Sequence, residues 1–452
     1  MILLILMLYL AKISSKFLAY AYMEQNTLIK DLARHTGQAV TLNGWVHNFR
    51  SSGKIAFWQI RDGSGFCQAI IAADVVGEAL WEQAQLVTQE TSVCLQGTIS
   101  KHPKKEEYEL QVSNFTFYQI SEEYPIANKD HGIDFLLDNR HLWLRSPKQW
   151  AIQRVRDTLI HATYDFMRAN NVTKIDSPII TANAGENTTD LFKVNYFDDT
   201  TYLSQTGQLY IEAAIYAHGR VFDFGPTFRA EKSKTRRHLT EFWMMDAELA
   251  FINLDQNLDF QESLIRSMVQ AVLEKNKTEL EILERDIIPL QNISKPFYRI
   301  THSEAVAQLK GMGSDIGERS DLGADDETML TKAYDNPIFI TRYPAEVKAF
   351  YMKRDPKDDS RVLGADLLAP EGYGEIIGGS QREEDYDLLK KRIDEFGLKV
   401  EDYQWYLDLR KYGSVPHGGF GFGLERITAW VCGLQHIREA IPFPRTIYRI
   451  TP

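Results

Sequence analysis

The chain has 452 residues, a formal net charge of −11, 44% hydrophobic residues and 25% charged residues. This length supports two or three domains with a sizeable core, and the composition is that of an ordinary soluble globular protein. The acidic balance argues against indiscriminate nucleic-acid binding but leaves room for a local basic surface. Three scattered cysteines, Cys67, Cys94 and Cys432, argue against a disulfide framework and have no metal-like spacing.

Residues 1–22 form an apolar extension, MILLILMLYLAKISSKFLAYAY. Lys12 interrupts the run well short of the roughly 20 residues that span a bilayer, and the basic start of a secretory signal is missing. A membrane anchor or targeting segment is therefore the weaker interpretation. We expect Met23 to be the true start and the extension to come from an upstream start codon.

Residues 23–122 are predicted to form an N-terminal domain. Short strands alternate with turns from Ala39 onwards: VTLNGWVHNFR, IAFWQIRD, FCQAIIA, SVCLQGTISKH and YELQVSNFTFYQI. The helix-like GEALWEQAQL lies between the third and fourth strands. This order predicts an OB-fold, a five-stranded β-barrel whose strand face commonly binds single-stranded nucleic acid. A different small barrel with an unrelated partner is the alternative.

Residues 123–146 contain prolines and lack strong periodicity, which favours a hinge before a domain at 147–452. That domain alternates strands and helices, so the predicted fold class is α+β. Residues 148–171 have helical apolar spacing and end at an Asn-Asn pair that suits a C-cap. Residues 172–180, VTKIDSPII, are expected to form a strand carrying Pro178. The other expected strands are TYLSQ, RVFDFG, FWMMDAELAF, NPIFITRY and GEIIGG, and the other expected helices are LDFQESLIRSMVQAVLEK, REEDYDLLKKRIDEFG and RITAWVCGLQHIREA.

Residues 228–242, FRAEKSKTRRHLTEF, concentrate five cations in an acidic chain. The flanking sequences favour two antiparallel strands, so the cations would lie in the loop of a hairpin. Guanidinium groups bind phosphate oxygens in pairs, and Arg229 and Arg237 can therefore hold two phosphates of one nucleotide. Phe242 offers a stacking face for the base. A solvated loop without a specific ligand is the alternative.

Two glycine-rich stretches can complete a nucleotide site. In residues 374–382, GEIIGGSQR, Glu375 can ligate Mg²⁺ together with Asp366, and Arg382 can serve as a second anion clamp. In residues 417–434, HGGFGFGLERITAWVCGL, Arg426 lies at a helix start, where the helix dipole disfavours a cation. A ligand phosphate or a stacked base would explain Arg426. Since the sequence has no GxxxxGK[ST] motif, side chains must supply the phosphate contacts.

These stretches resemble motif 2 (FRxE) and motif 3 (GxGxER) of the class II aminoacyl-tRNA synthetases, and Pro178 stands where motif 1 carries its proline. The barrel makes the chain similar to the subgroup for aspartate, asparagine and lysine, from about Met23 to Pro452. The resemblance implies an OB-fold anticodon-binding domain and a catalytic domain built on an antiparallel sheet flanked by helices. It also implies a cytoplasmic C2 homodimer that uses ATP with Mg²⁺.

The resemblance also implies the roles of individual residues. For ATP they are Arg229, Ala230, Glu231, Arg237, His238, Leu239, Phe242, Glu375, Gly423, Leu424, Glu425 and Arg426. For the amino acid they are Glu186, Gln208, Ile211, Glu212, Arg229 and Arg382. Catalysis would rest on Arg229, Glu231, Glu375 and Arg426, and the metal on Glu375 and Asp366. Gly378 departs from the aspartyl pattern, which has a serine near the metal, and this leaves the metal coordination open.

Residues 201–213, TYLSQTGQLYIEA, bear on the choice of amino acid. Aspartyl enzymes carry a lysine where this chain has Ile211, and Glu212 follows it. If the segment is helical, Gln208, Ile211 and Glu212 share one face. A buried carboxylate of aspartate would lack its counter-charge there, whereas a carboxamide can donate to Glu212 and accept from Arg382. Thr446 in PFPRT also resembles the asparaginyl enzymes, although Ile211 as a packing residue is the alternative.

The barrel segment FWQIRDGSGFCQ resembles anticodon-reading strands of the family. Phe57 would stack on the middle uridine of the anticodon and Gln68 would bind its edge; a core position for Phe57 is the alternative. The implied activity is activation of L-asparagine by ATP and its transfer to tRNA-Asn. The alternatives are a nondiscriminating aspartyl-tRNA synthetase, an asparagine synthetase-like paralogue and a noncatalytic tRNA-binding protein.

Overall fold

The computed structural model describes residues 26–127, 129–182, 191–233 and 235–452. The chain divides into two compact units, one ending at Gly132 and one running from Ile133 to Pro452. This boundary falls inside the segment 123–146 that the sequence suggests as a hinge, and helices α4 (Ile133–Asp138) and α5 (Arg140–Trp143) occupy its second half. A hinge function stays a prediction. Residues 1–25, with the proposed start at Met23, lie outside the described residues.

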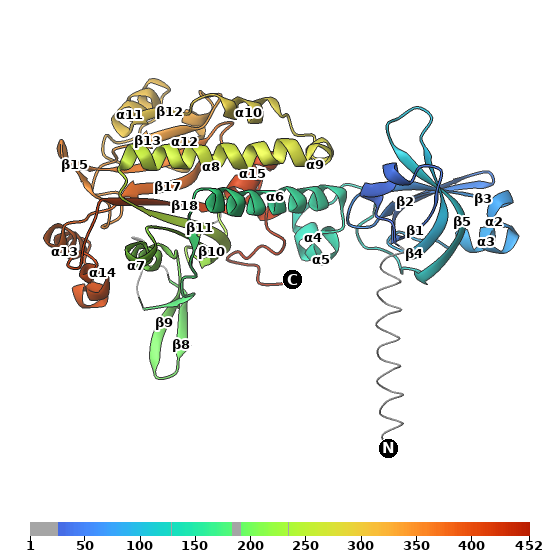
Figure 1. The fold of residues 1–452 in the computed structure, drawn as a ribbon, viewed down its shortest axis with the longest axis horizontal. Coiled ribbons are helices and arrows are strands. Elements are labelled where there is room, and N and C mark those ends of the chain that lie inside the picture. Colours follow the sequence, from blue (N-terminus) through green and yellow to red (C-terminus); the bar gives the residue numbers. More distant parts are fainter. Residues whose placement is uncertain (1–25, 128, 183–190, 234) are drawn as a thin grey trace, which may run out of the picture. The chain divides into compact units, whose positions relative to one another are not determined.

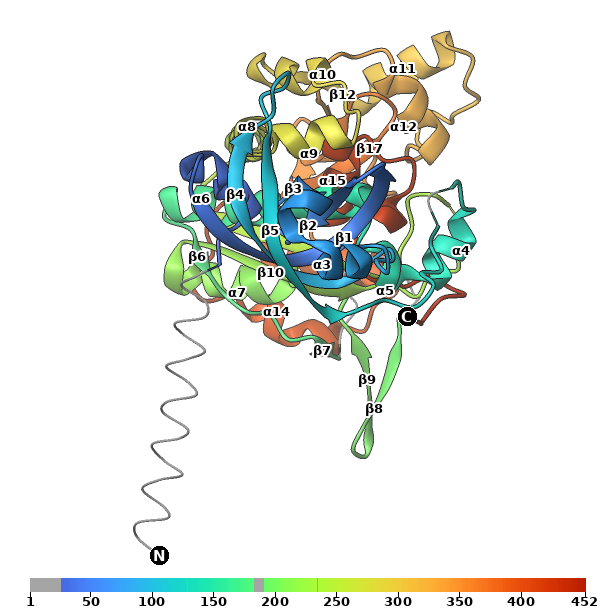
Figure 2. The same ribbon diagram turned by 90° about the vertical axis from the view of Figure 1, so that its right-hand side faces the viewer.

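The N-terminal unit is the closed five-stranded barrel that the sequence predicts (Figure 2). The strand order is β1-β2-β3-β5-β4, and only β3 and β5 pair in parallel. The strands are β1 (Ala39–Ser52), β2 (Ile55–Arg61), β3 (Phe66–Ala72), β4 (Ser92–Lys101) and β5 (Tyr108–Gln119). The predicted helix is present as α3 (Glu78–Ala84), which follows α2 (Ala73–Val76), and η1 (Ile29–His35) precedes the barrel.

Strand alternation fills the barrel and decides which side chains face outwards. On β2 and β3 the buried core residues are Ala56, Trp58, Ile60, Cys67, Ala69 and Ile71. The residues between them, including Phe57 and Gln68, lie on the outer face because successive strand side chains point to opposite sides. Phe57 is half-buried and does not belong to the barrel core.

The second unit is built on a mixed eight-stranded sheet (Figure 1). Its order is β12-β13-β16-β17-β18-β11-β10-β6, and all neighbours are antiparallel except β12–β13 and β10–β6. The strands are β12 (Tyr298–Thr301), β13 (Ile338–Thr341), β16 (Gly364–Ala369), β17 (Gly374–Gln381), β18 (His417–Gly423), β11 (Glu241–Ala250), β10 (Arg220–Phe228) and β6 (Thr173–Lys174). Two small sheets add β7 (Ile180–Thr181), β8 (Lys193–Tyr196) and β9 (Asp199–Leu203), and β14 (Arg354–Asp355) and β15 (Asp358–Val362).

Three helices, α6 (Pro147–Ala169), α8 (Leu254–Lys275) and α15 (Leu424–Cys432), cover one face of this sheet in a shared apolar core. Figure 1 shows α6 and α8 side by side. Local signals fix the ends of these helices: Ser146 caps α6, and Asn253 with Gln256 forms a capping box at α8. The remaining helices are α7 (Gln208–His218), α9 (Lys277–Ile282), α10 (Ile288–Gln291), α11 (His302–Gly311), α12 (Ala324–Thr331), α13 (Tyr386–Glu395) and α14 (Gln404–Asp408), with short turns η2 (Asn292–Ser294), η3 (Val400–Tyr403) and η4 (Ile437–Glu439).

Two sequence expectations need correction. The segment 172–180 is not one strand: only β6 and the start of β7 are extended ladders, with Pro178, which has no N–H to donate, between them. The helix expected over 426–440 ends at Cys432, because Gly433 adopts a left-handed conformation (φ 71°) and serves as the C-cap. The chain then continues as the short turn η4.

Candidate active site

The three cation-bearing stretches meet at one cavity of about 290 Å³ on the sheet face opposite α6, α8 and α15. The β10–β11 hairpin, the β16–β17 pair and the β18–α15 junction all contribute to its lining. The predicted residues that line it are Gln208, Arg229, Arg237, His238, Leu239, Phe242, Asp366, Glu375, Arg382, Gly423, Glu425 and Arg426. Residues far apart in the chain are therefore brought together as the motifs predict.

Two glycines between two carboxylates form the floor of the cavity. Asp366 pairs in register with Gly378, Gly378 with Gly421, and Gly421 with Asp246, so the four lie in one row across β16, β17, β18 and β11. A Cβ atom at Gly421 would lie 2.2 Å from Oδ1 of Asp246. Because Gly421 has no side chain, the carboxylate of Asp246 can lie across it, and a ligand can approach the backbone of this strand closely.

The arginines at the hairpin end of the cavity have partners within the protein. The guanidinium of Arg229 lies over the ring of Phe242, 5.3 Å from its centroid. Arg426 donates from Nη1 to a carboxylate oxygen of Glu375 at 3.0 Å and to the backbone oxygen of that residue at 2.9 Å. The Arg426–Glu375 pair is about one-third exposed on both sides, which leaves it accessible to a ligand.

Arg237 reaches away from its loop to helix α12. Its Nη1 donates to Oε2 of Glu327 at 2.9 Å, and its Nη2 donates to the hydroxyl of Thr328 at 2.6 Å. The same Oε2 of Glu327 accepts from the backbone N–H of Glu375 at 3.1 Å. Burial, together with the nearby charge of Glu375, raises the pKa of Glu327 to about 7. Glu327 therefore links the cationic loop to the strand that carries Glu375.

Asp366 and Glu375 form a carboxylate pair at the floor. From the position of a Cβ at Gly378, Oε1 of Glu375 lies 3.2 Å away and Oδ1 of Asp366 lies 3.7 Å away. Burial raises the pKa of Asp366 to about 6; the nearby Lys348, which donates to it at 2.7 Å, opposes this shift, and Glu375 adds to it. At Glu375, Arg426 and Lys348 outweigh the effect of desolvation, so its pKa falls below its ordinary value.

This carboxylate pair fits a magnesium ion that arrives with a nucleotide. Mg²⁺ is usually held by one or two carboxylates plus substrate phosphates. Among the described residues there is no cluster of three or more His, Cys, Asp or Glu side chains suited to a metal, so a purely protein-made metal centre is not indicated. The space above Gly378 is small, because a side chain there would press against Glu375.

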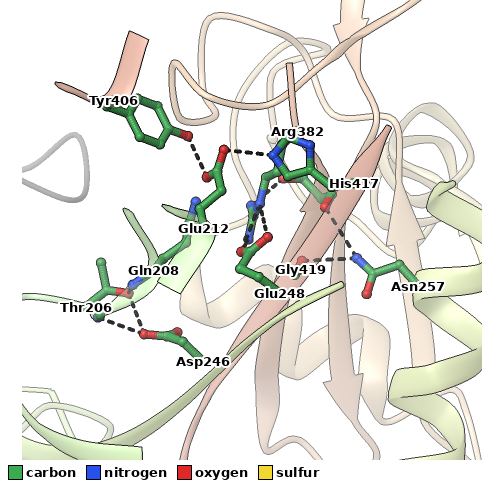
Figure 3. A network of polar contacts seen from close by, with 12 residues as sticks. Thr206, Gln208, Glu212, Asp246, Glu248, Asn257, Arg382, Tyr406, His417 and Gly419 are labelled. Atoms are coloured by element: carbon green, nitrogen blue, oxygen red, sulfur yellow. Dashed lines mark hydrogen bonds and ion pairs between the residues drawn. The ribbon is translucent and has the colours of Figure 1, made fainter. Parts of the chain in front are cut away.

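The other end of the cavity is backed by a buried ionic network (Figure 3). Glu212 is fully buried and accepts hydrogen bonds from Arg410, from Tyr406 at 2.6 Å and, through Nε2, from His417 at 2.8 Å. Burial would raise the pKa of Glu212, but Arg410 and His417 hold it well below its usual range. Glu212 is thus a charged and fully partnered group.

Arg382 forms the adjacent part of the network and lines the cavity. Its guanidinium pairs with the fully buried Glu248 and donates to the hydroxyl of Ser380 at 2.6 Å. Glu248 lies opposite Gly419 in the ladder, where a Cβ would lie 2.1 Å from its carboxylate. The two buried arginines, Arg382 and Arg410, therefore each have a carboxylate partner.

Of the residues predicted on helix α7, only Gln208 reaches the cavity. The segment is helical as expected, but Ile211 is fully buried in a small apolar cluster with Ile215, and Glu212 faces the network behind the cavity wall. Among the described residues, Nε2 of the buried Gln208 has no hydrogen-bond acceptor. A buried donor at a cavity wall favours a ligand oxygen as its partner.

Glu231 and Glu425 are held by partners within the protein. Glu231 pairs with His238 at 3.1 Å, and this hydrogen bond lowers its pKa. Glu425 is buried and accepts from Arg156 at 2.8 Å. Ala230 and Leu424, the residues next to Arg229 and Glu425, do not line the cavity, and Glu186 lies outside the described residues.

The sequence analysis missed the polar cavity residues Thr206, Asp246 and Lys348, and it missed Glu327, which contacts Arg237 without lining the cavity. Asp246 accepts from the Thr206 hydroxyl at 2.6 Å and from the backbone N–H of Gly207 at 2.9 Å. Strand alternation from the predicted β11 could have placed Asp246 on the ligand face. Glu327 and Lys348 come from segments without a local pattern, and only long-range packing identifies them.

The comparisons with known proteins agree over nearly the whole chain. Residues 132–447 match the family described as tRNA synthetases class II (D, K and N), and residues 40–117 match the OB-fold nucleic acid binding domain. The chain is 50% identical to the asparagine–tRNA ligase of Desulforamulus reducens and 51% identical to that of Pelotomaculum thermopropionicum, in each case over 95% of this chain and 100% of the relative.

Solved structures show the same similarity. The asparaginyl-tRNA synthetase from Pyrococcus horikoshii complexed with asparaginyl-adenylate has a TM-score of 0.90 and 46% identity, with 93% of this chain and 97% of that chain covered. An aspartyl tRNA synthetase from Entamoeba histolytica has a TM-score of 0.81 and 27% identity, with 94% and 93% covered.

Proposed function

We propose that this chain, which belongs to the class II tRNA synthetases (D, K and N) and among them to the asparaginyl-tRNA synthetases, carries out both steps of its reaction at the cavity described above. The family makes it an aminoacyl-tRNA ligase that consumes ATP. The observation that carries the assignment to this cavity is the meeting of Arg229, Arg237, Arg426 and the carboxylate pair on one sheet face.

The first step joins asparagine to ATP. The α-carboxylate of asparagine attacks the α-phosphorus, the bond to the bridging oxygen breaks, and pyrophosphate leaves. Arg229 stabilises the charge that develops on the α-phosphate, and Arg237 with His238 holds the leaving pyrophosphate. Phe242 and Arg426 hold the adenine between them. No side chain acts as a nucleophile, so catalysis rests on positioning and electrostatics.

Magnesium binds with ATP in this proposal. Glu375 and Asp366 would hold the ion, which would supply positive charge next to the phosphates. Arg426 exchanges part of its contact with Glu375 for the nucleotide.

Selection of asparagine follows from the pairing of charges at the side-chain end. Arg382 is neutralised by Glu248, and Arg410 by Glu212, so among the described residues an incoming carboxylate finds no unmatched buried arginine at this end. A neutral carboxamide avoids that penalty and can accept from Arg382. In this arrangement Glu212 acts through the network behind the wall rather than by touching the substrate, and Ile211 packs in the core that positions it.

In the second step a hydroxyl of the terminal ribose of tRNA-Asn attacks the carbonyl carbon of asparaginyl-adenylate, the acyl–phosphate bond breaks and AMP leaves. The barrel binds the anticodon through Phe57 and Gln68. We also propose a C2 homodimer and a cytoplasmic location. Among the described residues, no helix has the length and apolarity required to cross a membrane.

The test is aminoacylation of a tRNA-Asn transcript by the full chain, followed by identification of the esterified amino acid by mass spectrometry. Offered both amino acids, the enzyme should yield asparaginyl-tRNA alone. Aspartyl-tRNA as the main product would support a nondiscriminating aspartyl enzyme. Free asparagine formed from aspartate and ammonia, with no esterified tRNA, would support the paralogue alternative.

A further inference from the structure

Lys348 holds a positive charge inside the cavity, beside the carboxylate pair proposed for Mg²⁺. Its Nζ donates to Oδ2 of Asp366 at 2.7 Å and lies 3.2 Å from Oδ1 of Asp321. The side chain lines the cavity and is only 14% exposed. The other oxygen of Asp366, Oδ1, faces the space above Gly378, as does Oε1 of Glu375. Lys348 and a metal ion would therefore share one carboxylate.

The packing around Lys348 fixes the position of its ammonium group. The residue lies in the segment between β13 and β14, and its Nζ lies over the ring of Tyr343, 3.9 Å from the centroid. Tyr343 is buried and its ring contacts His302, with the ring centroids 5.0 Å apart. Arg392 donates from Nη2 to the backbone oxygen of Ala345 at 2.9 Å, which holds the same segment. An ammonium group with a cation–π contact and two carboxylate partners gains little by leaving them.

The carboxylate pair already has its counter-charges in the protein itself. Lys348 pairs with Asp366, and Arg426 pairs with Glu375 at 3.0 Å. These four groups together carry no net charge. Asp321 adds one negative charge, but its side chain is about half exposed, so water screens it. A free divalent ion at the pair would gain little attraction and would be repelled by the ammonium of Lys348.

The triphosphate of ATP changes this balance. It adds several negative charges and supplies oxygens for the ion, and Mg²⁺ is usually held by one or two carboxylates together with substrate phosphates. The attraction to the phosphates then outweighs the repulsion from Lys348. Without the nucleotide that attraction is missing, while the repulsion remains.

We propose that Lys348 keeps free divalent metal ions out of the carboxylate pair, so that the metal enters the site only together with ATP. The inference rests on the proposed function, because it takes Asp366 and Glu375 as the metal site. Lys348 is a positioning residue in this scheme: it holds Asp366 and needs no contact with the substrate.

The experiment titrates Mn²⁺, a paramagnetic substitute for Mg²⁺, into the full chain without nucleotide at about pH 8, where protons compete little for carboxylates. Electron paramagnetic resonance measures the free Mn²⁺. Lys348→Met removes the ammonium but keeps an unbranched side chain, and this variant should bind a single Mn²⁺ at least about tenfold more tightly than the wild type. The gain should disappear when Asp366→Asn is added, and this double variant also measures the weak binding of Mn²⁺ elsewhere on the acidic surface. Lys348→Arg keeps the charge and should bind Mn²⁺ no better than the wild type.

Lys353→Met is the matched control. Lys353 lies in the same segment, pairs with Glu384 and does not line the cavity. The control removes the same charge from the chain, so it should bind Mn²⁺ as the wild type does. Thermal unfolding shows whether each variant is folded. If Lys348→Met does not fold, Lys348→Gln, which retains a donor to Asp366 without the charge, carries the test with the same expected gain.

A second titration, with ATP present and bound Mn²⁺ followed by water-proton relaxation, separates this inference from the proposed metal site. Here Asp366→Asn alone should weaken the binding of Mn²⁺, and if it does not, the metal site itself is wrong. If it does, but the wild type and Lys348→Met bind Mn²⁺ equally without ATP, the metal site stands and the role of Lys348 is wrong. An equal gain in Lys348→Arg would also overturn the proposal, because the altered contact rather than the lost charge would then admit the ion.

Discussion

The ion pairs at the two ends of the cavity differ in how deeply they are buried. Behind the end proposed for the substrate side chain, Glu212, Glu248 and Arg410 are almost completely buried and each has a partner of opposite charge. At the end proposed for the nucleotide, the Arg426–Glu375 and Arg237–Glu327 pairs remain partly exposed. Buried pairs hold a fixed geometry, because removing one partner leaves a desolvated charge. Exposed pairs can exchange partners at lower cost, as binding and release of a polyanion require.

Loss of Arg229 should have the largest effect. Arg229→Ala removes the guanidinium assigned to the α-phosphate, and asparagine-dependent ATP–pyrophosphate exchange should fall on the order of 10³-fold. Arg236→Ala is the matched control, because Arg236 is exposed in the same loop and does not line the cavity. Near-normal exchange in Arg229→Ala, with folding unchanged, would remove Arg229 from the mechanism.

A substitution in the buried network should lower the stability of the protein. Arg410→Ala leaves Glu212 buried without its arginine, and the free energy of unfolding should drop by about 3–5 kcal/mol in urea titrations. Arg319→Ala breaks an exposed pair with Glu346 and should stay close to the wild type. Similar losses in the two variants would show that burial does not distinguish the two pairs.

The buried network around Glu212 should also make the stability of the protein fall at low pH. The pKa of Glu212 is depressed in the folded state, so its stabilising contribution is present above its unfolded value of 4.5 and is lost as the pH falls below it. Glu212→Gln cannot titrate and should lose less stability than the wild type on acidification. Parallel acid profiles for the two proteins would contradict the assignment of a charged Glu212.

A substitution in the partly exposed Arg237–Glu327 pair should change the affinity for ATP. Arg237→Ala should raise the KM for ATP roughly 10–100-fold, the range expected for a lost charge-assisted hydrogen bond, with a smaller change in kcat. The readout is exchange at varied ATP concentration. An unchanged KM would mean that Arg237 keeps its contact with α12 when ATP binds.

Glu327 should give a pH-dependent effect on stability. Its folded pKa of about 7 lies above the unfolded value of 4.5, so the ligand-free wild type loses stability as the pH rises through that window. Glu327→Gln cannot ionise, and its stability relative to the wild type should rise between about pH 5 and about pH 8. Urea unfolding at both pH values measures this change, and an equal difference at both would contradict the raised pKa.

The sequence was sufficient where spacing determines structure. Strand alternation predicted the barrel, and the glycines of HGGFGFG, with Glu375 and Arg426 nearby, indicated a ligand face before any long-range contact was known. Gly433 also offered a signal for the end of α15, although the helix expected from apolar spacing ran past it.

The sequence was insufficient where a charge depends on a distant partner. The partner of Glu212 is Arg410, 198 residues along the chain, so its neutralisation has no local signature. The charge argument for asparagine therefore rests on the pairing of Arg382 and Arg410 rather than on an unmatched Glu212 beside the substrate. The links from Lys348 to Asp366 and from Glu327 to Arg237 likewise come only from packing between separate segments.

ATP–pyrophosphate exchange without tRNA, with asparagine and aspartate offered separately, tests the central claim most directly. Because Arg382 at the cavity wall and Arg410 behind it are already paired with carboxylates, the enzyme should support exchange with asparagine and give little with aspartate. Robust exchange with aspartate would contradict this account of selection while leaving the fold and the adenylation chemistry in place.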